Sequence, residues 1–540
     1  MSSAILARHL GETLRLNRNG PIFWPALRSF LSVLLPLATL FQLDRMDLVA
    51  GAVFGGLTSV YCRSEPSRHQ IRSLAVVAAG MVVAVALGDL IALWGLPSGR
   101  QQLVAVVGTA VVGAVATAAT TAARVGAPGG LIFAFATGAC ANLSLSPDEL
   151  PAHLTVCALS GAFAWGVCSL GAVLAGLRPQ RRAVAAALEA TAAHLANPDL
   201  DGRHRAAVAI ENARTRLPLV SARRRESTEY RELVRAVEVC EVLLGASRVA
   251  RATVWSLRAT AERVRTGQPL HPPGYARPDR PLGPGPPPSR WWAVREVLLA
   301  TARPRRGTGT WLLPFAARVG TAALISGVAA QLLGLGHTYW AAVSAVSVLQ
   351  ATSTSRSVPR MLQRVAGTLG GVVLGMLLLS LHPRVWVIIL LLAALQWAAE
   401  MTVTINYAFG LLFVTPVALL VGGMMSSAPP EELAASRLWT TLLGAAVAVL
   451  VARLAPHRAW LVRVRDALDR VRRLVELGGA APRQQLRQAL VELHDAYDTA
   501  AGEVPDEHLP TEELLRVSRR AYRLLDERDY PSPRPRETAG

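Results

Sequence analysis

The stretch from Tyr339 to Gly375, YWAAVSAVSVLQATSTSRSVPRMLQRVAGTLGGVVLG, decides the fold. An apolar run ends in a polar bend, and arginines then recur every four residues at Arg356, Arg360 and Arg364. Residues four apart lie on one face of a helix, so these side chains would stack together. The stretch therefore predicts a membrane hairpin with a basic turn.

Small residues mark the return helix of this hairpin. Gly367, Gly371 and Gly375 are again four apart and open a second apolar run. Such spacing leaves one stripe of a helix without side chains and lets another helix approach closely in a bilayer. We expect the return helix to be tightly packed along this stripe.

The same hairpin occurs earlier in the chain, at 48–80. A constant offset of 292 places Arg68 on Arg360 and Arg72 on Arg364. A second pair of matches lies downstream, where FAT at 135–137 matches FVT at 413–415, and PDEL at 147–150 matches PEEL at 430–433. Two landmarks in the same order indicate an internal duplication.

Composition places the chain in a membrane. Of its 540 residues 52% are hydrophobic and 17% charged, against about 25% charged in soluble domains. Apolar runs of membrane-spanning length recur, so we predict an all-α polytopic membrane protein. The formal charge is +19 and all basic residues are arginine. The arginines flank the apolar runs, which favours anionic lipid headgroups over nucleic acid as their partners.

Two parallel repeats of about six spans each are expected, with ten to twelve spans in all. The loops after the even-numbered spans carry the arginines, so both termini are predicted to be cytoplasmic in a bacterial inner membrane. The apolar segments lie at 26–43, 48–62, 71–96, 101–123, 129–145, 151–177, 312–334, 338–352, 362–381, 384–404, 405–425 and 433–455. The predicted domains are a cytoplasmic interfacial segment (1–25), a first transmembrane repeat (26–177), a cytoplasmic helical domain (178–268), a Pro-rich linker with a basic juxtamembrane segment (269–310), a second transmembrane repeat (311–455) and a C-terminal cytoplasmic helical region (456–540).

The two polar regions carry amphipathic stripes. Leu233, Val237, Cys240 and Leu244 step by four, three and four, and similar stripes recur within 461–475 and 486–497. The stripes could pack the two regions together or form a dimer contact. Nine prolines within 269–288 predict a stiff, extended linker.

Motifs for catalysis are absent. The chain has no Walker A sequence, GxSxG, HExxH or dinucleotide fingerprint. The five cysteines form no CxxC pattern, and Cys157 and Cys168 are interpreted as packing residues. His153, near the outer end of its span, is interpreted as interfacial. We therefore expect no enzyme, no cofactor and no metal.

The paired arginines allow two interpretations. Arg68, Arg72, Arg360 and Arg364 could anchor the protein among headgroups. They could instead form an electropositive vestibule that gathers organic anions, because a guanidinium matches a carboxylate in a planar fork. A duplicated anchor would show the same spacing, so the sequence leaves both open.

Further candidates lie within the spans. Thr415-Pro416 and Thr137-Gly138 occupy corresponding points of the two repeats, and a helix could break at either point. In transporters, paired helix breaks indicate a binding site near the middle of the membrane. An ordinary kink would show the same sequence. Asn406-Tyr407 could line the inner opening of the eleventh span. Two intramembrane acids, Asp89 and Glu400, are candidates for proton coupling, because an unpaired charge in hydrocarbon costs several kcal/mol. Glu400 lies near the inner end of its span, so it could instead be solvated or paired with an arginine.

The second half resembles the fusaric-acid-resistance-like (FUSC) family. The resemblance rests on YWA at 339–341, Arg360-xxx-Arg364-xx-Gly367-Thr368, Asn406-Tyr407-Ala408 and Phe413-xx-Pro416. It covers about 325–455 and is weak over 25–177. It implies an inner-membrane exporter of aromatic or other organic acids, driven by the proton gradient.

Efflux of small organic, aromatic carboxylic acid-like anions is thus the leading hypothesis. A passive organic-anion channel and a membrane scaffold with partner-binding helical domains are the alternatives. The expected partners are an organic anion and anionic lipid, with no nucleic acid; a homo-oligomer or an accessory efflux protein is left open.

Overall fold

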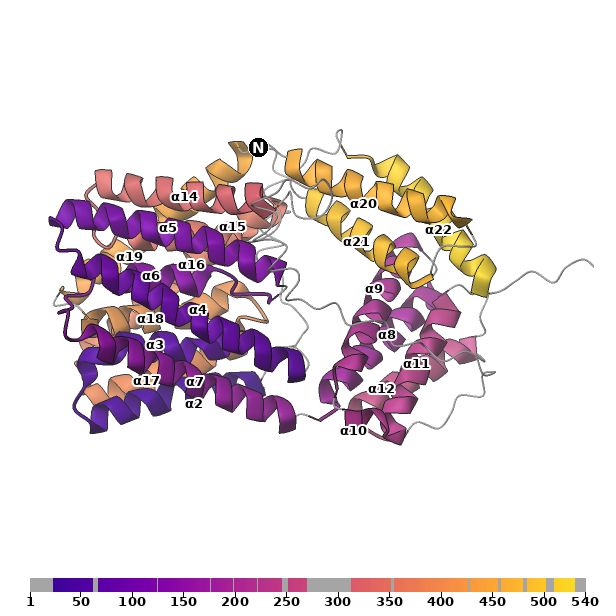
Figure 1. Cartoon of the computed structure of the whole chain (residues 1–540), viewed down its shortest axis with the longest axis horizontal. Helices are drawn as coiled ribbons and strands as arrows, with labels where there is room; N and C mark the ends of the chain where they lie inside the picture. The colour runs from indigo at the N-terminus through magenta and orange to yellow at the C-terminus, as the bar shows by residue number, and fades with distance from the viewer. Residues whose placement is uncertain are drawn as a thin grey trace, which may run out of the picture. The chain divides into compact units, whose positions relative to one another are not determined.

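The computed structural model describes residues 23–529 except 62–66, 124, 175, 198, 221, 245–250, 270–311, 351–353, 426–427, 455–457, 479–482 and 502–508. Over these residues the chain is helical and contains no strand. It divides into two compact units (Figure 1). Unit 1 holds the apolar helices and unit 2 holds the polar helical regions. The predicted linker at 269–310 lies almost wholly outside the described residues.

Unit 1 contains two sets of six helices that run roughly parallel in one bundle (Figure 1). The first set is α2 (Phe23–Gln42), α3 (Val49–Gly56), α4 (Ser67–Leu93), α5 (Ser98–Ala122), α6 (Leu131–Cys140) and α7 (Leu150–Leu174). The second set is α14 (Leu312–Leu332), α15 (Tyr339–Leu349), α16 (Thr354–Ser380), α17 (Val385–Thr402), α18 (Tyr407–Met425) and α19 (Pro430–Leu454). Within the described chain, nine helices are long and apolar enough to cross a membrane, and α6, α15 and the α3 region are shorter. The prediction of an all-α polytopic membrane protein is confirmed.

The two sets pack against each other reciprocally. The first helix of each set contacts the fourth of the other, in the pairs α14–α5 and α2–α17. The second helix of each set likewise contacts the fifth of the other, in the pairs α15–α6 and α3–α18. Such exchange is the arrangement expected when two copies of one unit face each other across a pseudo-two-fold axis. The packing supports the internal duplication predicted from the landmarks.

The glycine stripe of α16 does receive a close helix, which is α18. A Cβ on Gly371 would lie 2.6 Å from the Cβ of Thr415, and one on Gly375 would lie 2.8 Å from Leu419 Cδ1. Contacts under about 3 Å are not tolerated between carbon atoms, so only glycine allows this approach. The predicted role of the stripe is confirmed.

Two helices begin earlier than predicted. α2 begins at Phe23, so Trp24 and Pro25 lie in its first turn, where proline is tolerated because the first backbone N–H groups have no partner in the helix. α16 begins at Thr354, before the apolar segment expected from 362, so Arg360 lies on the helix as its four-residue spacing from Arg364 indicated.

Of the two alternatives for the fifth and eleventh spans, a break or an ordinary kink, the break is not found. α6 continues through Gly138, and α18 continues through Pro416 to Met425. A proline inside a membrane helix removes one hydrogen bond but is tolerated where neighbouring helices pack closely, as α16 does here.

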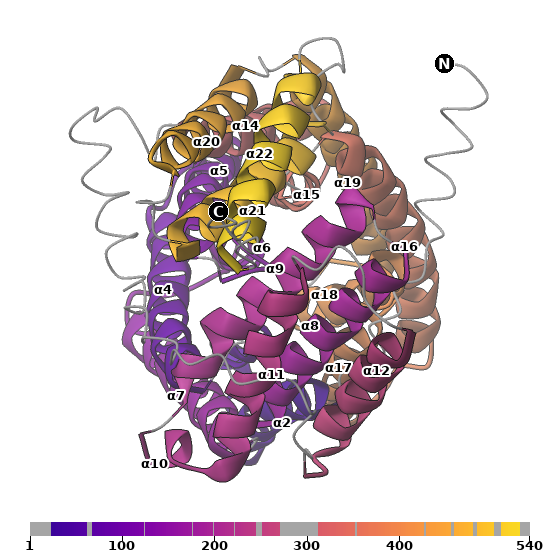
Figure 2. The same cartoon turned by 90° about the vertical axis from the view of Figure 1, so that its right-hand side faces the viewer.

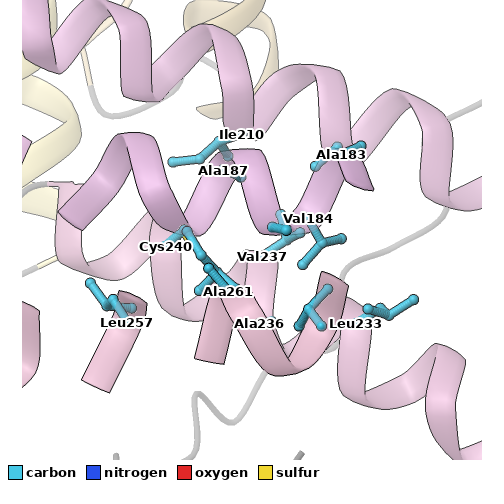
Figure 3. Packing of buried hydrophobic residues seen from close by; sticks show 14 of the residues in the cluster. Ala183, Val184, Ala187, Ile210, Leu233, Ala236, Val237, Cys240, Leu257 and Ala261 are labelled. Atoms are coloured by element: carbon cyan, nitrogen blue, oxygen red, sulfur yellow. The ribbon is translucent and has the colours of Figure 1, made fainter. Parts of the chain in front are cut away.

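Unit 2 is built around the bundle of α8 (Arg178–Ala196), α9 (Leu200–Arg216), α11 (Thr228–Leu244) and α12 (Arg251–Thr266), with the short α10 (Ala222–Arg225) between α9 and α11. The stripe Leu233, Val237, Cys240 and Leu244 is buried in its core. Figure 3 shows Leu233, Val237 and Cys240 of α11 packed among Val184 and Ala187 of α8 and Ala261 of α12.

Three C-terminal helices complete unit 2: α20 (Arg458–Glu476), α21 (Arg483–Ala501) and α22 (Thr511–Asp529) (Figure 2). They share a second core that includes Leu468, Leu490 and Leu525. α21 packs on α9, and Arg487 pairs with Glu241 at 2.7 Å. The two polar regions do pack together, but through α9 and α21; the stripes themselves are buried in two separate cores, so packing the two regions onto each other is not their main role.

Candidate functional site

The short helix α15 lies at the centre of the candidate site. All eleven of its residues are buried. It packs on α14, α16 and α19 of its own set and on α5 and α6 of the other. Serine and tryptophan side chains on α15 therefore meet polar groups from neighbouring helices and not solvent.

Arg364 of α16 is held by hydroxyl groups. Its Nη1 donates to Ser347 Oγ at 2.8 Å and to Tyr407 Oη at 3.1 Å, and its Nη2 donates to Ser344 Oγ at 3.1 Å. The side chain is only 2% exposed. These neutral partners satisfy hydrogen bonds but supply no countercharge.

Arg360 lies one helical turn earlier on α16 and reaches the same place. Its Nε donates to the Ser347 backbone oxygen at 3.1 Å, and its guanidinium stands 4.4 Å from the centroid of the Tyr407 ring. Tyr407 Oη is also 2.6 Å from Ser347 Oγ. The predicted pair Arg360 and Arg364 thus converges on one serine and one tyrosine.

A third arginine, Arg437 of α19, lies farther along α15. Its guanidinium stands 4.8 Å from the centroid of the buried Trp340 ring. The side chain is 4% exposed, and neither Nε nor Nη1 has a hydrogen-bond partner among the described residues. Arg364 is close enough to Arg437 for the two charges to repel each other.

The three arginines follow one face of α15. Trp340, Ser344 and Ser347 are spaced four and three apart, which places them on one stripe of a helix. At 1.5 Å rise per residue the stripe spans about 10 Å. The Arg437 guanidinium contacts the ring of Trp340. Arg364 donates hydrogen bonds to Ser344 and Ser347. Arg360 donates to the backbone oxygen of Ser347. We call Arg360, Arg364 and Arg437 the arginine ladder.

The ladder has no acidic counterpart in the part of the chain that the structure describes. None of its three members forms an ion pair with a described carboxylate. A buried charge without a countercharge costs several kcal/mol, even after relaxation. The ladder is therefore a place where an anion would be strongly stabilised.

The first repeat does not reproduce the ladder. Arg72 matches Arg364 in sequence, but its side chain is exposed. The side chain of Arg68 lies outside the described residues. The offset of 292 matches Ser344 with Ala52 and Ser347 with Gly55, so the hydroxyl partners are missing as well.

The other predicted site residues have structural contacts. Asn406 Oδ1 accepts from the Ala408 backbone N–H at 2.9 Å at the start of α18. Thr137 Oγ1 donates to the Ala84 backbone oxygen at 2.8 Å, which joins α6 to α4. Thr415 and Pro416 are buried against the glycine stripe of α16, and Thr415 Oγ1 has no hydrogen-bond partner among the described residues.

Both intramembrane acids are buried. Glu400 is 4% exposed and accepts from Gln396 Nε2 at 3.4 Å. Asp89 is fully buried, and its Oδ2 lies 2.8 Å from His153 Nδ1. His153 is itself 1% exposed, so the interpretation of this residue as interfacial is wrong. α7 packs its first turn onto Gly51 of α3, and this contact buries the imidazole.

Arg437, Ser344 and Ser347 of the candidate site were not predicted from the sequence. Arg437 could have been found, because an ionisable residue inside an apolar span is a functional candidate whichever charge it carries. The two serines offered no such signal, since serine is common at helix contacts in membranes.

The fold and the ladder define a polytopic helical membrane protein with two related halves and a buried cationic site in the second. Residues 324–451 match the family model described as fusaric acid resistance protein-like. The chain is also 25% identical over 502 residues to the uncharacterized membrane protein YvaC of Bacillus subtilis (strain 168), which covers 84% of this chain and 77% of that protein. No solved structure matches the chain. Over residues 324–451 the chain is therefore similar to the fusaric acid resistance-like (FUSC) family, in agreement with the resemblance of its second half, and its relative is likewise a membrane protein.

Proposed function

We propose that this protein is a transporter that exports small organic, aromatic carboxylic acid-like anions across the bacterial inner membrane and binds them on the arginine ladder. The observation that carries the proposal is the burial of Arg364 and Arg437 with no described acid beside them. A carboxylate would supply the missing charge, and the half-buried ring of Tyr407 and the buried ring of Trp340 would suit an aromatic body.

The orientation fits export. The positive-inside rule places the start of α16 and the polar helical regions in the cytoplasm. Arg360 would then meet an anion from the cytoplasm first, and Arg364 and Arg437 would follow toward the outside. Both termini would be cytoplasmic in this arrangement.

Energy would come from the proton gradient. Glu400 and Asp89 are the buried acids that could exchange a proton with the transport cycle. Glu400 is the stronger coupling candidate, since Asp89 already belongs to a cluster with His153 and Cys140. A passive channel would use the same ladder without either acid, so flux that persists after the gradient is collapsed would favour the channel.

The test is efflux of a labelled aromatic acid from vesicles that contain correctly oriented protein. One Arg–carboxylate contact is worth roughly 1.5–3 kcal/mol, so Arg364→Ala should weaken apparent affinity about ten- to a hundredfold. Arg364→Lys keeps the charge but loses the planar fork, so partial function is expected. Arg384→Ala is the matched control, because Arg384 is exposed just before α17. Unchanged affinity in Arg364→Ala would overturn the proposal.

A further inference from the structure

Three side chains that could each coordinate a metal ion lie close together in the first repeat. Asp89 lies in the last turns of α4, Cys140 is the last residue of α6 and His153 lies in the first turn of α7. One ligand atom from each lies within 4.8 Å of the other two. All three side chains are buried, at 0%, 0% and 1% exposure. They belong to three different helices, and the packing of the three helix ends brings them together.

The donor set suits a transition metal. Thiolate, imidazole and carboxylate are the three ligand types that zinc takes in proteins. Zn–N and Zn–S bonds of about 2.0–2.3 Å place tetrahedral ligand atoms roughly 3.5 Å apart, which the cluster reaches with small side-chain movements. Three protein ligands leave a fourth position for water or another small ligand.

Polar atoms in the cluster also lack partners. Asp89 Oδ1 and His153 Nε2 are buried and have no hydrogen-bond partner among the described residues. A hydrogen bond from His153 to Asp89 accounts for one oxygen and one nitrogen only. A buried carboxylate oxygen without a partner costs free energy, and a bound cation would remove that cost.

The surrounding backbone holds the cluster in place. A Cβ on Gly51 would lie 3.0 Å from His153 Cδ2, and one on Gly88 would lie 2.7 Å from Cys140 Cβ. These glycines let α3 and α4 pack directly against the ligand side chains, so their orientation is fixed by helix contacts. Such support is what a metal site requires around its ligands.

We propose that Asp89, Cys140 and His153 form a binding site for one divalent transition-metal ion of the zinc class. The proposal goes beyond the transport of anions and does not depend on it. Extending the offset of 292 beyond the matched hairpin places Leu381 opposite Asp89, so the second repeat has no carboxylate at that position. It replaces the expectation from sequence that the chain binds no metal.

Cobalt provides the direct test, because a thiolate bound to Co²⁺ gives a charge-transfer absorption band. The purified full-length protein in detergent is treated with a chelator, freed of it and titrated with Co²⁺. We expect one Co²⁺ per chain with a thiolate band, displaced by Zn²⁺. Cys140→Ser should lose the band, and His153→Gln should bind Co²⁺ at least about tenfold more weakly.

Cys168→Ser is the matched control. Cys168 is an equally buried thiol in α7 but lies outside the cluster, so this variant should keep the band. Absence of the band in folded wild-type protein, or a band that survives in Cys140→Ser, would overturn the proposal. The readout is metal binding alone, so its failure would leave the anion-transport proposal untouched, and the reverse also holds.

Discussion

Arg437 lies in the third turn of α19, where an apolar helix would be expected to carry leucine or valine. Its guanidinium is buried against Trp340 and close to Arg364, so it is held next to a like charge. Such an arrangement destabilises the protein without ligand. A residue that lowers stability in this way is best explained by function.

Replacement of Arg437 should therefore separate stability from transport. Arg437→Met keeps a long side chain and removes a buried, repelled charge, so the melting temperature should rise or stay unchanged. Transport of an aromatic acid should fall at least about tenfold, because one of the three arginines of the arginine ladder is lost. Arg384→Met, at an exposed position, should change neither quantity. A clear drop in melting temperature for Arg437→Met would indicate a structural arginine.

At the residue scale, the sequence predicted two of the three arginines of the ladder. Arg360 and Arg364 stood out because their spacing recurs in both halves, and they do meet at Ser347 and Tyr407. Arg437 lies on another helix, and its approach to Trp340 depends on which faces of α15 and α19 meet. No local pattern encodes that choice, and the exposed Arg72 shows that repeated spacing alone does not guarantee a shared environment.

At the scale of elements, the contact between α16 and α18 is the one that the sequence specified best. Gly371 faces Thr415, and the added side chain in Gly371→Leu would collide with it. We expect a loss of folded protein after mild detergent extraction and a lower melting temperature. Gly422→Leu makes the same change where a Cβ would meet nothing within 4 Å. Equal yields of the two variants would show that the stripe does not carry the packing.

The α9–α21 contact in unit 2 contains a pH-sensitive histidine. His204 of α9 stacks on His494 of α21, with ring centroids 4.1 Å apart. Burial, then His494 and Arg205, lower the pKa of His204 to about 4. The unfolded value is about 6.5, so between these values the unfolded chain binds more protons than the folded one. The stability from neutral His204 is complete above about pH 6.5 and is lost as the pH falls toward 4.

His204→Phe should flatten this dependence. Thermal melts followed by circular dichroism between about pH 7 and pH 4.5 would measure it, with exposed His382→Phe as control. Burial raises the pKa of Glu211, so the contribution of Glu211 to stability changes with pH in the opposite direction. That contribution is the same in wild type, His204→Phe and His382→Phe, so it cancels in the comparison. Equal pH dependence in wild type and His204→Phe would contradict the assignment.

At the scale of the whole molecule, the duplication determines the architecture. The landmarks predicted two sets of six helices, and the reciprocal pairs α2–α17 and α5–α14 show how the sets face each other. The sequence could not predict that α15 packs on helices of both sets, because its contacts with α5 and α6 join residues about two hundred positions apart. The duplicated pattern also did not predict that the two halves differ, with the arginine ladder in the second repeat and the Asp89 cluster in the first.

The predicted orientation can be tested with two single cysteines. Cys140, Cys157, Cys168 and Cys240 are buried, so replacing Cys62 should leave little background labelling. A cysteine at exposed Ser146, between α6 and α7, should react with an impermeant thiol reagent in intact cells. One at exposed Thr228 in unit 2 should react only after lysis. The reverse pattern would invert the topology and with it the direction of export.

The most direct test of the ladder as an anion site is ligand-induced thermal stabilisation of the purified protein. Benzoate and salicylate would be compared with their neutral amides, which have the same shape but no charge. A ligand at about 100 times its Kd stabilises the folded state by roughly 2.7 kcal/mol, and the acids should raise the melting temperature while the amides should not. The double variant Arg364→Ala, Arg437→Met should lose the shift. Equal shifts from acids and amides, or an acid shift that survives in the double variant, would contradict an anion site on the arginine ladder.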